Sequence, residues 1–151
     1  MGQNIEDANF SECLKKGRLK KFAQAHSLIA KEIENAKNDL DTAFDSITRE
    51  NYKWATIQAY YAMFHTARAL LYSKGFRGRS YYCLIIAIKV LFVSEKLLDI
   101  RLVEVLQMAK TLRENADYEN EFSQDSAETL VEKAQEFLSK AKEILSFSGH
   151  T

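Results

Sequence analysis

The sequence contains no proline and only 5 glycines in its 151 residues. Strand-and-turn architectures need both residue types to reverse the chain, so their scarcity argues against an all-β fold and favours long helices. Acidic and basic residues are balanced, with 21 of each and a formal net charge of zero. No whole-chain electrostatic field therefore draws the protein towards nucleic acid or an acidic membrane.

Metal-binding and cofactor-binding signatures are also absent from the sequence. It has no Glu-x-x-His pair, no phosphate-binding glycine loop and no Cys/His ligand set, so we expect no metal and no other cofactor. Cys13 and Cys83 lie in apolar surroundings, which predicts buried free thiols and, in turn, a reducing, cytoplasmic setting. The first residues lack a basic region followed by an apolar run, so we expect no signal peptide.

The segment from Tyr52 to Leu71 dominates the apolar pattern of the chain. A helix there has almost no polar side, and a helix that is apolar nearly all round must be surrounded, so we predict it at the centre of a bundle. Its length is close to that of a membrane span, but four polar interruptions argue against a membrane. They are Lys53, Gln58, His65 and Arg68. One apolar stripe consists of Trp54, Ile57, Tyr61, Phe64 and Leu71, and a small-residue stripe consists of Ala55, Ala59, Ala62 and Ala69.

Helical spacing of apolar residues continues on both sides of this segment. We predict an all-α fold, an antiparallel up-and-down bundle of about five main helices, because the connections are short. The whole chain, residues 1–151, is expected to be a single domain with a short N-terminal helix at 5–16 and the bundle at 23–147. The main helices are expected at 26–46, 52–71, 81–93, 100–116 and from Ser123 or Ser126 onwards.

Turn chemistry marks the ends of these helices. Thr48 or Asn51 could cap the central helix, and Ser80 and Asp99 are predicted caps of the next two. Gly75 is a candidate for the left-handed residue after a helix. The basic segment at 15–22 is interpreted as a solvated linker or as a small patch for phosphate.

Three stretches together resemble the HEPN domain family, in its branch of small archaeal and bacterial proteins. They are AYYAMFHTARALLYSKGF at 59–76, LFVSEKLLD at 91–99 and LRENADYENEF at 112–122. The resemblance implies a dimerising antiparallel helical bundle. It also implies a nucleotidyltransferase as partner, often in a toxin–antitoxin pair. Many members are metal-independent ribonucleases whose motif is an arginine, roughly four to six residues, and then a histidine.

This sequence departs from that ribonuclease motif. No histidine follows Arg113 until His150, and Tyr81 stands where related proteins often have a second histidine. The expected general base is therefore missing, and we predict an interaction module with a nucleotide or RNA site. Two alternatives remain, a metal-independent ribonuclease with a degenerate site and a structural bundle without a ligand.

Several residues are candidates for the site, each with a structural alternative. Arg113 and Asp117 can form an intrahelical ion pair beside Tyr118, or together grip a phosphate. His65 is either a core histidine or a general base that acts with Arg68 or Arg113.

The aromatic and loop candidates complete the prediction. Tyr61, like Tyr60, Tyr81 and Tyr82, either packs in the core or stacks on a base. Arg77 and Arg79 flank Gly78 in a loop that is either solvated or binds an anion. The predicted nucleotide or RNA site comprises Arg113, Asp117, Tyr118, Arg77 and Tyr61, and the catalytic candidates are Arg113, Tyr118 and His65. The expected partners are a second copy of the chain and a nucleotidyltransferase, with no membrane.

Overall fold

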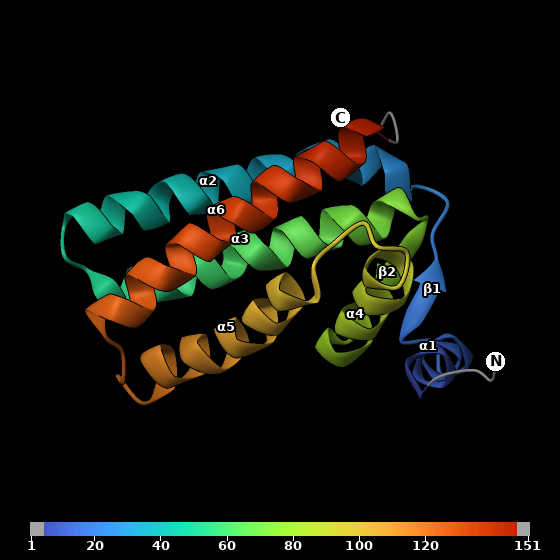
Figure 1. Ribbon diagram of the computed structural model, residues 1–151, viewed down its shortest axis with the longest axis horizontal. Coiled ribbons are helices and arrows are strands. Elements are labelled where there is room, and N and C mark those ends of the chain that lie inside the picture. Colours follow the sequence, from blue (N-terminus) through green and yellow to red (C-terminus); the bar gives the residue numbers. More distant parts are fainter. Residues whose placement is uncertain (1–4, 148–151) are drawn as a thin grey trace.

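A computed structural model describes residues 5–147 and shows a bundle of long helices (Figure 1). Helices α2, α3, α5 and α6 run along the long axis with alternating direction, α4 crosses them steeply, and α1 lies beside α4. The predicted all-α, up-and-down bundle is therefore confirmed. The elements are α1 (Ile5–Lys15), β1 (Leu19–Lys21), η1 (Ala25–Leu28), α2 (Ile29–Thr48), α3 (Tyr52–Ser73), β2 (Phe76–Gly78), α4 (Tyr81–Ile88), η2 (Lys89–Val93), α5 (Ile100–Tyr118) and α6 (Gln124–Phe147).

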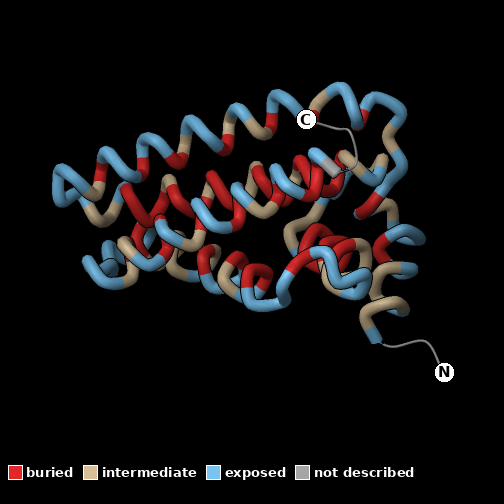
Figure 2. The backbone as a smooth tube through the Cα atoms, turned by 45° about the horizontal axis from the view of Figure 1, so that its top comes forward, coloured by how far each residue is buried: buried red, intermediate tan, exposed pale blue. Residues whose placement is uncertain are grey.

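Helix α3 is the central element, as its sequence predicts. It packs against α2, α5 and α6, and the inward sides of these helices carry most of the buried residues (Figure 2). The four alanines of the small-residue stripe are fully buried. The expectation of a surrounded helix is wrong at Trp54, which lies in the first turn of α3 and is 46% exposed. Among the described helices, none is long and apolar enough to cross a bilayer.

The predicted helix ends are mostly confirmed. Ser80 accepts a hydrogen bond from the Cys83 N–H at 3.0 Å, and Asp99 accepts one from the Arg101 N–H at 2.9 Å. Gly75 has φ +82°, a conformation that glycine adopts without a steric penalty. The cap of α3 differs, because Asn51 precedes the helix without a side-chain cap bond. Thr48 instead donates to the Phe44 carbonyl at 3.1 Å.

The predicted helix at 81–93 changes its winding at Lys89. Residues 89–93 form a π-helical segment, η2. Its wider turn is continued by bonds across five residues, from the Ser94 N–H to Lys89 O at 2.9 Å and from the Leu97 N–H to Phe92 O at 2.8 Å. Phe92 is fully buried in this segment.

A two-stranded antiparallel sheet replaces the linker and loop that we expected at 15–22 and 76–80. Strand β1 pairs with β2, with Leu19 opposite Gly78. Leu19 is 1% exposed, so its burial anchors β1. A Cβ atom on Gly78 would lie 3.2 Å from Leu71 Cδ2, which shows how closely β2 approaches α3.

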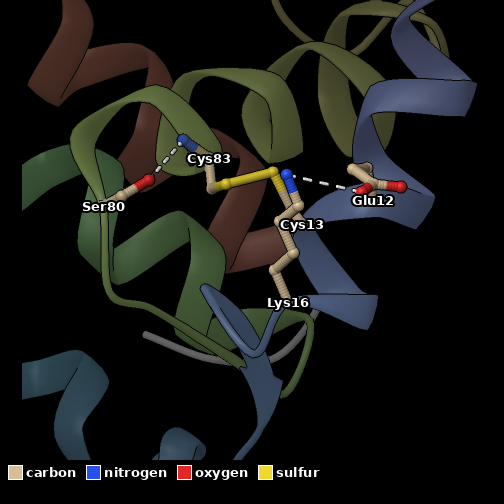
Figure 3. The surroundings of a disulfide bond; sticks show 5 residues. All are labelled: Glu12, Cys13, Lys16, Ser80 and Cys83. Carbon is tan, nitrogen blue, oxygen red and sulfur yellow. Dashed lines mark hydrogen bonds and ion pairs between the residues drawn. A yellow bond between two sulfur atoms is a disulfide. The ribbon is translucent and has the colours of Figure 1, made fainter.

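The two cysteines form a disulfide that joins α1 to α4, and the predicted free thiols are wrong (Figure 3). Cys13 and Cys83 are 70 residues apart in sequence, and both are buried. Their separation could not show that α1 and α4 lie side by side. A disulfide gives no support to the reducing compartment that free thiols predicted.

Candidate functional site

Arg113 of α5 is the centre of the site predicted from the sequence. Its guanidinium donates a hydrogen bond to the Tyr61 hydroxyl of α3 at 2.8 Å and lies 3.4 Å from the Asp117 carboxylate. A longer contact of 3.5 Å reaches the Tyr118 hydroxyl. The guanidinium carbon lies 5.4 Å from the ring centres of Tyr61 and Tyr118 and 5.9 Å from that of Tyr60. We call Arg113, Tyr61, Asp117 and Tyr118 the Arg113 site.

Burial and charge give this arginine an unusual environment. The side chain of Arg113 is 20% exposed, and its Nε is buried without a hydrogen-bond partner among the described residues. The pKa of Arg113 is raised: burial opposes the charge most strongly, but Tyr61, Tyr118 and Asp117 together outweigh it. Tyr118 is 68% exposed. A charged and positioned guanidinium therefore lies next to an exposed aromatic ring.

The tyrosines behind Arg113 are held in the protonated form. Burial is the main cause that raises the pKa of Tyr60, with Tyr61 adding to it and Arg113 opposing it. Burial likewise raises the pKa of Tyr81 well above its ordinary value. The Tyr81 hydroxyl donates to the Leu106 carbonyl at 2.6 Å. Neither phenol is therefore poised to accept a proton at neutral pH.

His65 lies in a separate polar cluster between α2 and α3. Its Nδ1 is 2.7 Å from Glu32 Oε2, and its Nε2 is 3.6 Å from Asp39 Oδ2. Glu32 is buried, and its other oxygen lies 3.8 Å from Arg68. Burial raises the pKa of Asp39, and His65 opposes this shift. Because both ring nitrogens face carboxylates, the geometry favours a structural role for His65.

Arg77 lines a second site, a cavity of about 370 Å³ between α3, β2 and α4. Three arginines contribute to its wall, Arg68, Arg77 and Arg79. We call this cavity the arginine pocket. Its other lining residues are Phe64, Leu71, Tyr72, Gly78, Ser80, Tyr81 and Leu84.

The structure thus brings together four of the predicted site residues and separates two. Asp117, Tyr118 and Tyr61 each contact Arg113, whereas Arg77 lines the arginine pocket and His65 lies against α2. Sequence reasoning missed Glu32 and Tyr72. The only signal for Tyr72 is its position four residues after Arg68, one helical turn away.

A larger groove of about 640 Å³ lies between α5 and α6. Its lining carries both signs of charge, so it shows no preference for an anion or a cation. The lining comprises Asp99, Arg101, Leu102, Glu104, Val105, Met108, Lys133, Glu136 and Lys140. Within residues 5–147, no group of three or more His, Cys, Asp or Glu residues is placed to hold a metal ion.

Comparison with known proteins bears on the same region of the chain. The HEPN domain family model matches residues 29–145, from the start of α2 into α6. "Putative toxin MJ0142" of Methanocaldococcus jannaschii is 30% identical over 119 residues, which cover 78% of this chain and 81% of that protein. "Putative toxin MJ0605" of the same organism is 29% identical over 114 residues, 75% of this chain and 85% of that protein. The matched family region contains both the Arg113 site and the arginine pocket.

Proposed function

Because this chain belongs to the HEPN domain family, we propose that it is the toxin-type component of a two-component pair whose partner is a nucleotidyltransferase. In this proposal the chain is an interaction module that binds a nucleotide or RNA at the Arg113 site. The names of the two relatives support the toxin-type role. The identification of the partner as a nucleotidyltransferase rests on the family resemblance alone.

The observation that carries the binding proposal is the state of the Arg113 guanidinium. It is fixed by Tyr61 and Asp117, it lies beside tyrosine rings, and its buried Nε has no partner among the described residues. A planar guanidinium held in this way suits a phosphate oxygen, and the exposed ring of Tyr118 offers a stacking surface for a base.

The surroundings of the catalytic candidates favour binding over cleavage. His65 is engaged by two carboxylates of α2, and none of the contacts of Arg113 within residues 5–147 is with a histidine. A general base for RNA cleavage must reach the 2′-hydroxyl with a vacant acceptor. Tyr118 is the exposed hydroxyl beside Arg113, and a phenol is a poor base at neutral pH.

Exposed aromatic residues support a dimer that forms at one end of the bundle. Trp54 in the first turn of α3, Tyr118 at the end of α5 and Phe122 just before α6 are 46%, 68% and 47% exposed. These element ends lie together in Figure 1. Association there would bury apolar surface and bring two Arg113 sites close to each other.

Co-expression with a nucleotidyltransferase encoded beside this chain tests the partnership. We expect the two proteins to co-purify at a fixed stoichiometry in 0.5 M salt, roughly the strength at which weak surface ion pairs are screened. A Trp54→Asp variant should weaken self-association in light scattering without unfolding the protein, since Trp54 is already half exposed. A monomer at all concentrations would contradict the dimer.

Fluorescence anisotropy with a short single-stranded RNA tests the Arg113 site. Arg113→Ala should weaken binding by about tenfold, the effect of losing one charge-assisted contact. The matched control is Arg101→Ala, which removes an exposed arginine from the other end of α5 and should change binding by less than about twofold. Equal losses of RNA affinity in the two variants would show that the RNA does not bind at the Arg113 site. Metal-independent cleavage of the RNA that depends on Arg113 would reject a pure binding role.

A further inference from the structure

The arginine pocket is a second basic site, apart from the Arg113 site. We propose that it binds a linked di- or triphosphate group, either as a free polyphosphate or as part of a nucleotide. The proposal rests on the charge, geometry and size of the pocket and does not depend on the toxin-type role.

Charge is concentrated in this pocket although the whole chain is neutral. Its lining contains three arginine residues and no acidic residue. Arg77 and Arg79 form no ion pair with any of the described residues, in contrast to Arg68 and Arg113. A cavity with basic residues and no acidic residue in its lining attracts a multiply charged anion.

Arg68 is held in position on the helical wall of the pocket. It donates a hydrogen bond to the Tyr72 hydroxyl at 2.7 Å, and its guanidinium carbon lies 5.5 Å from the Phe64 ring centre and 5.7 Å from that of Tyr72. These contacts restrict the side chain before any ligand arrives, which lowers the entropic cost of binding. Glu32 lies 3.8 Å away but is shared with His65 at 2.7 Å, so it neutralises Arg68 only in part.

The backbone at the other two arginines of the pocket is held by hydrogen bonds to the segment that contains β1. Arg77 is in β2, paired with Lys20 of β1, and its guanidinium carbon lies 5.4 Å from the Phe22 ring centre. The Arg79 N–H donates to the Arg18 carbonyl at 2.8 Å. Arg77 and Arg79 are therefore exposed residues on a fixed backbone, a combination that suits an anion arriving from solvent.

The size of the pocket favours linked phosphates. A cavity of about 370 Å³ lies at the lower end of the range for small-molecule sites. Guanidinium groups bind phosphate oxygens through paired N–H donors, and three arginine residues at one cavity carry more donors than a single phosphate needs. An extended RNA strand would need a long groove, whereas this cavity is confined between two helices and one strand.

Isothermal titration calorimetry with inorganic tripolyphosphate at fixed ionic strength tests the proposal. We expect one ligand per chain and at least about tenfold weaker binding in an Arg77→Ala/Arg79→Ala variant. The matched control is Lys20→Ala/Lys21→Ala, which removes the same charge from two exposed residues of β1 that do not line the pocket and should change binding by less than about twofold. Arg113→Ala should leave this binding unchanged, which separates the pocket from the Arg113 site.

Two further measurements make each outcome decisive. An Arg77→Lys/Arg79→Lys variant keeps the charge and loses the paired donors, so it should bind more weakly than the wild type even if the alanine variant misfolds. A nucleoside triphosphate that binds more tightly than tripolyphosphate identifies a nucleotide as the ligand, and equal affinity identifies the phosphate chain alone. The proposal is overturned if tripolyphosphate does not bind, or if Arg77→Ala/Arg79→Ala and Lys20→Ala/Lys21→Ala weaken its binding equally. It is also overturned if a 5′-hydroxyl RNA binds in a way that requires Arg77 and Arg79 while tripolyphosphate does not bind.

Discussion

The hydrogen bond of 2.8 Å between the Arg113 guanidinium and the Tyr61 hydroxyl joins two helices across 52 residues of sequence. Tyr61 is a partly buried residue of α3, and Arg113 lies in the last two turns of α5. Because Asp117 holds the same guanidinium from within α5, the arginine is fixed from both sides. This bond therefore serves the packing of α5 as well as the candidate site.

Tyr61→Phe should destabilise the protein by about 1–2 kcal/mol, because it leaves a largely buried guanidinium N–H without its protein partner while the ring stays in place. Urea unfolding at neutral pH measures this change. Tyr82→Phe is the matched control. Tyr82 is 57% exposed, and its hydroxyl forms no hydrogen bond within residues 5–147, so the free energy of unfolding of this variant should be nearly unchanged. A double-mutant cycle with Arg113→Met should show coupling, and strictly additive effects would contradict the packing role.

Glu32→Ala should destabilise the protein by roughly 2–3 kcal/mol, since it removes a buried carboxylate and leaves His65 and Arg68 without their shared partner. Glu32→Gln keeps an acceptor for the His65 ring and should cost less. Glu34→Ala, on the exposed side of the same helix, provides the control in thermal unfolding. Equal stability of the two alanine variants would show that the His65 cluster contributes nothing to the α2–α3 contact.

The fold could be predicted from the sequence wherever one helix carries its own signal. The apolar periodicity of α3 and α6, the serine before α4 and the aspartate before α5 are local patterns, and each marks its element correctly. The sheet could not be predicted, because β1 and β2 each have three residues and pair across the whole length of α2 and α3. The disulfide was missed for the same reason, since it depends on how α1 and α4 pack.

The candidate site shows the same division between local and long-range information. The ion pair of Arg113 and Asp117 follows from their spacing on one helix. The contact of Arg113 with Tyr61 needs the packing of α5 against α3, and the cluster of His65 with Glu32 needs the packing of α2 against α3. Arg77 is exposed, as expected, but it lies in β2 and not in a loop, and only the tertiary structure places it with Arg68.

Reduction of the Cys13–Cys83 disulfide should lower the free energy of unfolding by about 4 kcal/mol, on the chain-entropy estimate for a closed loop of this length. Unfolding in guanidinium chloride with and without a thiol reductant measures the difference. A Cys13→Ala/Cys83→Ala variant should match the reduced protein and should not respond to the reductant. An unchanged unfolding midpoint in the wild type would mean that the two thiols are not bonded in solution.

The cap of α5 should make stability depend on pH in the acid range. The pKa of Asp99 is lowered, first by the hydrogen bond from the Arg101 side chain and then by that from the Arg101 backbone N–H. Since the folded pKa lies below the unfolded value of about 3.9, the unfolded chain binds more protons as the pH falls. The contribution of Asp99 is therefore complete above the unfolded pKa and is lost as the pH falls through the folded pKa.

Asp99→Asn isolates this contribution, because the amide keeps a cap acceptor and cannot titrate. The stability difference between wild type and Asp99→Asn should be largest at neutral pH and should shrink below about pH 4. Asp99→Ala lacks the cap acceptor as well and should stay less stable than Asp99→Asn throughout. Thermal unfolding of the three proteins across the acid range measures these differences. A stability difference between wild type and Asp99→Asn that does not change with pH would assign the effect of Asp99 to its shape and not to its charge.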